Sequence, residues 1–254
     1  MPSGPDTSNV GGNVGVFVTD EGVLVVDTNY NRQRRNGQSV AMGQAVVDQI
    51  KKITNQPIKY VINTHHHGDH TGGNPVFAKF AIIYAQQNVR NHLVTGWESA
   101  LKNAPGALAR AKQSLTEAQA GKDAQKIADA QEAVAQAQMN LEDAQSFDPH
   151  KAGPNVTYEG DLRFFLGGEE IHVFHPARAH TDGDSIIYFK NAKVAHWGDG
   201  FANNWVPVID AGSGGSSLEW LQFIDKGIQL VGEDTTMMGS SAVTRPLAGR
   251  IHFN

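Results

Sequence analysis

Hydrophobic and polar positions alternate in a way that divides most of the chain into short strands and helices. Apolar runs at residues 14–19 and 23–27 flank a short polar turn, which predicts a hairpin of two strands. Apolar side chains at helical spacing predict a helix over residues 41–53. Further apolar runs predict strands at residues 58–64, 80–85, 171–175, 185–189 and 193–197. Because strands and helices mix along the chain, the pattern favours an α/β fold over an all-β fold.

Residues 107–145 do not follow this alternation of short strands and helices, because they are rich in Ala, Gln, Lys and Glu and contain almost no strand formers. In the second half of this segment Ile127, Val134 and Leu141 recur at regular intervals, which gives a narrow apolar seam on a long helix. The segment is predicted to be a helical hairpin inserted in a single domain that spans residues 1–254. Three roles remain open for it: packing and solubility, contact in a homodimer, or a wall over the active site.

Composition and charge limit the classes of function. With 254 residues, of which 40% are hydrophobic and 19% charged, the chain can bury the core of one large domain. A formal net charge of -5 makes it a poor candidate for binding nucleic acid. The sequence has no cysteine, which excludes disulfides, thiolate zinc sites and a cysteine nucleophile. Any metal must therefore be held by nitrogen and oxygen ligands.

The sequence also bears on the membrane and the compartment. No apolar stretch reaches the length of a membrane-spanning helix, so we expect no membrane partner. The start of the chain has no basic region followed by an apolar run. The protein is therefore expected to be cytoplasmic, or periplasmic if a signal peptide has been removed.

Candidate metal ligands crowd into a short run after the predicted strand at residues 58–64: His65, His67, Asp69 and His70. In an extended segment His65 and His67 share a face and can converge on one ion. Asp69 and His70 come after a glycine, whose tight turn can aim them at a second point. Imidazole and carboxylate are the ligands that zinc takes when thiolate is absent. The alternative interpretation is a solvated polar loop with an accidental run of histidines.

This run resembles the HxHxDH signature of the metallo-β-lactamase superfamily. Residues 177–185, which contain His180, resemble the family's third motif. Residues 196–199 resemble the fourth motif, in which an aspartate, here Asp199, bridges two metals. The resemblance implies an αββα sandwich over residues 1–254, without the family's usual first strands and last helix.

The resemblance also implies how the metal ligands are shared. The first metal would have three histidine ligands: His65, His67 and His180. The second would have Asp69, His70 and Asp199, with Asp199 reaching both ions. The implied cofactor is zinc, one or two ions per chain. Asp69 would also orient the attacking water and later handle its proton, a role that needs a carboxylate within hydrogen-bond reach.

The implied activity is hydrolysis of an acyl bond in a small-molecule substrate by attack of metal-bound hydroxide, and a β-lactam, a lactone or a thioester all fit the motifs. The loops at residues 201–209 and 212–217 are expected to form the substrate pocket. The family's last histidine ligand falls on Ser240 or Ser241, so we expect a weaker second metal site and weak activity, with His252 a poor substitute. The alternatives are a mononuclear iron dioxygenase of the same fold and a metal-impaired, non-enzymatic scaffold.

Overall fold

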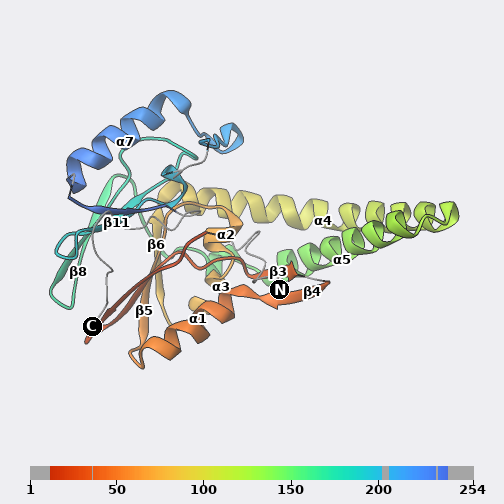
Figure 1. Ribbon diagram of the computed structural model, residues 1–254, viewed down its shortest axis with the longest axis horizontal. Helices are drawn as coiled ribbons and strands as arrows, with labels where there is room; N and C mark the ends of the chain where they lie inside the picture. The colour runs from red at the N-terminus through yellow and green to blue at the C-terminus, as the bar shows by residue number, and fades with distance from the viewer. Residues whose placement is uncertain (1–11, 36, 202–205, 233, 240–254) are drawn as a thin grey trace, which may run out of the picture.

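The computed structural model describes residues 12–35, 37–201, 206–232 and 234–239. Two five-stranded sheets lie face to face, with helices on both outer faces and a long helical pair projecting to one side (Figure 1). Between the sheets, Leu24, Val26 and Ile62 of one sheet pack against Val173 and Ile187 of the other, and all are buried. These four layers match the sandwich that the sequence predicts.

The first sheet is mostly parallel and carries the histidine run at one edge. Its strands, in spatial order, are β1 (Gly15–Thr19), β2 (Gly22–Val26), β5 (Ile58–Asn63), β6 (Ile82–Gln86) and β7 (Val156–Tyr158). Only the β1–β2 pair is antiparallel among these strands. Strand β2 is buried along its whole length, as expected for a strand covered on both faces. Because β2 and β5 run parallel, the residues that follow them meet at the same edge.

The second sheet is an antiparallel meander with one parallel strand added at its edge. In spatial order it contains β12 (Thr236–Met238), β11 (Val194–His196), β10 (Ile186–Phe189), β9 (Glu169–Phe174) and β8 (Asp161–Leu166). Strand β12 runs parallel to β11. The sequence predicts β9, β10 and β11 but not β8 or the short strands β7 and β12.

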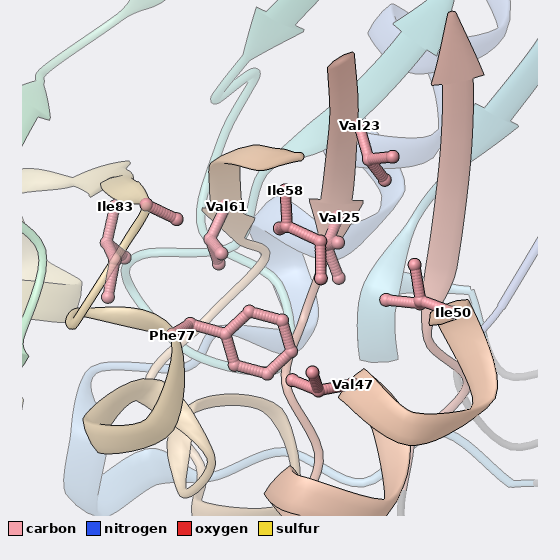
Figure 2. Close-up of a cluster of buried hydrophobic side chains, with 9 residues drawn as sticks. Val23, Val25, Val47, Ile50, Ile58, Val61, Phe77 and Ile83 are labelled. Atoms are coloured by element: carbon pink, nitrogen blue, oxygen red, sulfur yellow. The ribbon is translucent and has the colours of Figure 1, made fainter. Parts of the chain in front are cut away.

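Helices cover the outer faces of both sheets. Helix α1 (Met42–Ile53) places Val47 and Ile50 against the first sheet, beside Phe77 of the short helix α3 (Asn74–Phe77), as Figure 2 shows. On the second sheet, Trp220 and Phe223 of α7 (Ser217–Val231) pack against Trp197 in a third buried cluster. Within the described part of the chain, no helix is long and apolar enough to cross a membrane.

Two long helices that contact each other occupy the segment for which the sequence predicts an inserted helical hairpin. They are α4 (Gln87–Gly121) and α5 (Ala124–Ser146), so the first helix begins well before residue 107. Gln86 caps α4 by accepting a hydrogen bond from the backbone of Asn88, which fixes the early start. Left-handed Lys122 ends α4 and the side chain of Asp123 caps α5. Contact with a second copy through this hairpin stays a prediction.

A small hairpin that the sequence analysis did not predict joins this helical pair to the sandwich. It consists of β3 (Arg32–Arg35) and β4 (Gln38–Ala41). Arg32 binds Asp143 and Glu142 of α5 at 2.8 and 3.1 Å. The strands of this small hairpin are mostly polar, and ion pairs hold it to α5. The pattern of hydrophobic positions therefore does not predict it. The remaining short elements are the helices α2 (Gly68–Thr71) and α6 (Pro149–Ala152) and the 3-10 turns η1 (Gly198–Gly200) and η2 (Ala211–Ser213).

Candidate metal centre

The histidine run begins directly after β5 and leads into the single helical turn α2. His67 is extended and precedes the turn, and its carbonyl accepts hydrogen bonds from the backbone of His70 and Thr71 at 3.0 Å. The tight turn predicted at Gly68 is this helical turn, which Gly68 begins without a left-handed backbone angle. The change from strand to helix is therefore what directs His65 and His67 to one side and His70 to another.

The first group of candidate ligands is compact. His65, His67, His180 and Asp199 offer ligand atoms that all lie within 4.8 Å of one another. Nε2 of His180 lies 2.8 Å from Nδ1 of His67, and Nε2 of His65 lies 3.2 Å from the same atom. Oδ2 of Asp199 lies 3.5 Å from Nε2 of His180. Three imidazoles and a carboxylate that converge on one point match the ligand chemistry of a four-coordinate zinc ion.

Hydrogen bonds on the far side of two rings determine which nitrogen faces this point. Nδ1 of His180 donates to the carbonyl of Val208 at 2.8 Å, so its Nε2 is left with a lone pair. Nε2 of His67 donates to Oδ2 of Asp210 at 2.9 Å, so its Nδ1 is left with a lone pair. Such partners outside the ligand shell orient metal-binding histidines and fix their tautomers.

Asp27, which the sequence analysis did not single out, joins the two halves of the site. It follows β2, is fully buried, and its Oδ2 lies 2.7 Å from Nδ1 of His70. Its two carboxylate oxygens also accept hydrogen bonds from the backbone and the hydroxyl of Thr64, both at 2.8 Å. The hydroxyl of Thr64 in turn lies 3.2 Å from Nδ1 of His65. One buried carboxylate therefore orients a histidine from each proposed metal group.

The second group of candidate ligands surrounds a buried nitrogen without a hydrogen bond. Nε2 of His70 is buried and has no hydrogen-bond partner within the described residues. It lies 3.4 Å from Oδ2 of Asp69 and 3.4 Å from Oδ1 of Asp199. Because an unpaired buried nitrogen is costly, a cation held between this nitrogen and the two carboxylates would satisfy all three groups. The residues present therefore fit a second metal that shares Asp199 with the first.

Burial and neighbouring charges separate the pKa values of the histidines. Burial lowers the pKa of His65 well below its usual value, and the nearby histidines lower it further. Burial also lowers the pKa of His66 to about 3. Burial acts in the same direction on His70, but Asp27, Asp199 and Asp69 outweigh it and raise the pKa of that ring. His65 is consequently neutral, which is the form that binds a metal.

The structure brings together all of the residues that the sequence predicts as metal ligands: His65, His67, Asp69, His70, His180 and Asp199. Ser240, Ser241 and His252 lie outside the described residues, as do residues 202–205 of the first expected substrate loop. Trp197, which follows β11 within the predicted fourth motif, is fully buried in the core.

The likeness to known proteins extends over most of the chain. Residues 8–230 match the sequence model of a family described as the Metallo-beta-lactamase superfamily. The solved structure of metallo-beta-lactamase IND-7 has a TM-score of 0.58, is 18% identical, and the superposition covers 94% of this chain and 81% of that one. A metallo-beta-lactamase from Pontibacter korlensis has a TM-score of 0.55, is 17% identical, and the superposition covers 89% and 77%. At such identities these structures show the fold alone.

A curated relative is similar over a shorter region. A linear primary-alkylsulfatase of Pseudomonas sp. (strain ATCC 19151) is 33% identical to this chain over 82 residues. The matched region makes up 30% of this chain and 14% of the alkylsulfatase. The match therefore spans a small part of that enzyme, and the rest of the enzyme lies outside the matched region.

Proposed function

The chain belongs to the metallo-beta-lactamase superfamily, and on that premise we propose that it is a zinc-dependent hydrolase that cleaves an acyl bond in a small-molecule substrate. The observation that carries the proposal is the position of Asp199 between the two groups of ligands. One of its oxygens lies 3.5 Å from Nε2 of His180, and the other lies 3.4 Å from Nε2 of His70. A carboxylate placed in this way can bridge two metal ions.

The donor set supports zinc as the resident metal. His65, His67 and His180 would hold the first ion, and Asp69 and His70 the second, with Asp199 shared between them. When bound, such ions lower the pKa of a water molecule and polarise the bond to be broken. The protein's own contribution is to hold the imidazoles and the charged carboxylates in place, through Asp27, Asp210 and the carbonyl of Val208.

Asp69 is the residue proposed to handle the proton of the attacking water. Burial raises the pKa of its carboxyl, but the close contact with His70 and the charge of that ring outweigh burial and lower it. The carboxylate is therefore charged near neutral pH, and 27% of the side chain is exposed. It can accept a hydrogen bond from an incoming water, orient that water toward the substrate, and take its proton.

A second candidate activity is hydrolysis of an alkyl sulfate ester, supported by the local likeness to the alkylsulfatase. Sulfate esters and acyl compounds both react with water at an electrophilic centre and release a leaving group, which is oxygen in a sulfate ester or a lactone, nitrogen in a β-lactam and sulfur in a thioester. The same arrangement of Asp69 and the metal ligands suits either reaction. The substrate therefore has to be identified by assay.

The test combines metal content with a substrate panel. Protein purified without chelator is examined by elemental analysis and assayed with a chromogenic β-lactam, a lactone, a thioester and an alkyl sulfate. The proposal predicts zinc and hydrolysis of one of the acyl substrates. Turnover of the alkyl sulfate alone favours the second candidate. One iron ion per chain favours the dioxygenase alternative, and the absence of any metal favours a non-enzymatic scaffold.

A further inference from the structure

The segment between β2 and β3 has a strained backbone beside the candidate metal centre. Asp27 and Asn29 both have left-handed angles, with φ of 64° and 62°. Non-glycine residues adopt this conformation at a cost, and they keep it where the surrounding contacts determine it fully. Asp27 has a clear role as the partner of His70. The second left-handed residue, Asn29, sets the direction of the residue that follows it, Tyr30.

Contacts with the α2 turn hold this segment in place. The carbonyl of Asn29 accepts a hydrogen bond from the backbone of Gly73 at 2.8 Å, and its side chain accepts one from the backbone of Tyr30 at 2.7 Å. A side chain at Gly72 would bring its Cβ within 2.9 Å of Cα of Tyr30. The backbone of Tyr30 is thus fixed against the turn that carries Asp69.

One edge of the Tyr30 ring lies beside the start of this turn. At Gly68, the neighbour of Asp69, an added Cβ would meet only Cδ1 of Tyr30, at 4.0 Å. The ring is partly buried and interacts electrostatically with Asp69, His70 and Asp199. Burial and the charge of Asp69 raise the pKa of the phenol, which therefore keeps its proton near neutral pH. Within the described residues its hydroxyl has no hydrogen-bond partner, so its proton is available to a ligand.

From this geometry we infer that Tyr30 is a further catalytic residue, whose hydroxyl donates a hydrogen bond to the substrate oxygen that gains negative charge during hydrolysis. The inference rests on the proposed function. A neutral phenol suits the task, because it can stabilise a developing oxyanion without displacing the carboxylates from the metal ligand set. A hydrogen bond to a charged oxygen contributes enough to change a rate or an affinity by about tenfold to a hundredfold when the donor is removed.

Tyr30→Phe removes only the hydroxyl. Tyr84→Phe is the matched control, because Tyr84 is also partly buried but its ring packs against Phe164 at 4.6 Å in the core between the sheets. Both variants and the wild type are compared by zinc content, by kcat and KM, and by calorimetric affinity for a tetrahedral phosphonate that mimics the charged intermediate of acyl hydrolysis.

For Tyr30→Phe we expect unchanged zinc content, an affinity for the phosphonate about tenfold lower, and a kcat lower by at least the same factor. Tyr84→Phe is expected to behave as the wild type. Equal phosphonate affinity in the wild type and Tyr30→Phe, or no binding to either, overturns the inference, and so does loss of zinc from a folded Tyr30→Phe protein. If the wild type hydrolyses nothing, the proposed function fails, while the phosphonate affinities still decide the role of Tyr30.

Discussion

Oδ2 of Asp210 lies 2.9 Å from Nε2 of His67, and this contact joins the loop before η2 to the histidine run after β5. Asp210 is itself held by Ser213, whose hydroxyl donates to Oδ2 at 2.7 Å. The hydrogen bonds with Ser213 and His67 lower the pKa of the Asp210 carboxyl, so it is charged at neutral pH. The protein therefore fixes one tautomer of a proposed metal ligand from a segment distant in sequence.

This relationship predicts that Asp210→Asn weakens the first metal site while the protein stays folded. The loss of a charged acceptor lets the His67 ring rotate or change tautomer, and comparable changes weaken metal binding by about tenfold to a hundredfold. The affinity is measured by competition with a zinc chelator. Asp225→Asn, on α7, is the control. Equal zinc affinity in Asp210→Asn and the wild type would show that His67 needs no such partner.

His67→Ala is expected to abolish hydrolysis and leave the fold largely intact. The change removes one of three converging imidazoles, and the site is partly exposed, so little packing is lost. His172→Ala removes a histidine of β9 whose partner is Asp161, and it serves as the control. Turnover is measured with excess zinc, and folding by circular dichroism. Wild-type turnover in His67→Ala would contradict the ligand assignment.

The outer part of the helical hairpin is expected to be dispensable for metal binding. Replacing residues 114–131 with a short Gly/Ser linker keeps Asp143, Glu142 and Glu132, which bind Arg32 and Arg34 of the β3–β4 hairpin. This variant should keep zinc affinity and thermal stability close to those of the wild type, because no proposed ligand lies there.

Removal of residues 107–145 provides the comparison for this deletion. It also takes away Leu108, Met139 and Ala144, which are buried, and the ion pairs of Arg32. The melting temperature should therefore fall further than in the shorter deletion. Loss of zinc from the folded shorter deletion would show that the outer hairpin contributes to the site.

The metal-free protein is expected to lose stability as the pH falls below about 6.5. The pKa of His66 is about 3 in the folded protein, against an ordinary value of 6.5, because burial disfavours its charged form. Between pH 6.5 and about 3, His66 binds a proton in the unfolded chain but not in the folded chain. The free energy of unfolding therefore decreases as the pH falls through this range. His70, whose pKa is raised, acts in the opposite direction. The separate contribution of His66 is therefore visible only by comparison with His66→Gln.

Denaturant unfolding of the metal-free wild type and His66→Gln, at several pH values between about 3 and 7, measures this contribution. The variant should show a weaker decrease in stability toward acid pH. Parallel pH dependences in the two proteins would mean that His66 titrates alike in the folded and unfolded states.

The sequence best predicts those parts of the site whose residues lie close together in the chain. His65 to His70 lie within one short run after a clear strand, so their clustering could be predicted without a fold. Asp27 meets Thr64 only because β2 pairs with β5, and Asp210 meets His67 only after the intervening half of the chain has folded. Those contacts have no signature in local spacing.

The helices and strands that the sequence analysis did not predict include two different cases. The β3–β4 hairpin is polar and depends on ion pairs such as Arg32 with Asp143, so hydrophobic patterning does not reveal it. In contrast, α7 buries Trp220, Phe223 and Val231 at helical spacing, and that pattern was available in the sequence. The helix could therefore have been predicted, whereas the polar hairpin requires its partner.

Titration of the metal-free protein with zinc, followed by calorimetry with hydrolysis measured at each step, tests the shared two-metal centre most directly. Two ions per chain are expected: a tighter one at His65, His67 and His180, and a weaker one that needs Asp69 and His70, with activity rising as the second binds. The shared centre is contradicted if the protein binds no zinc, or if activity is complete with one ion bound.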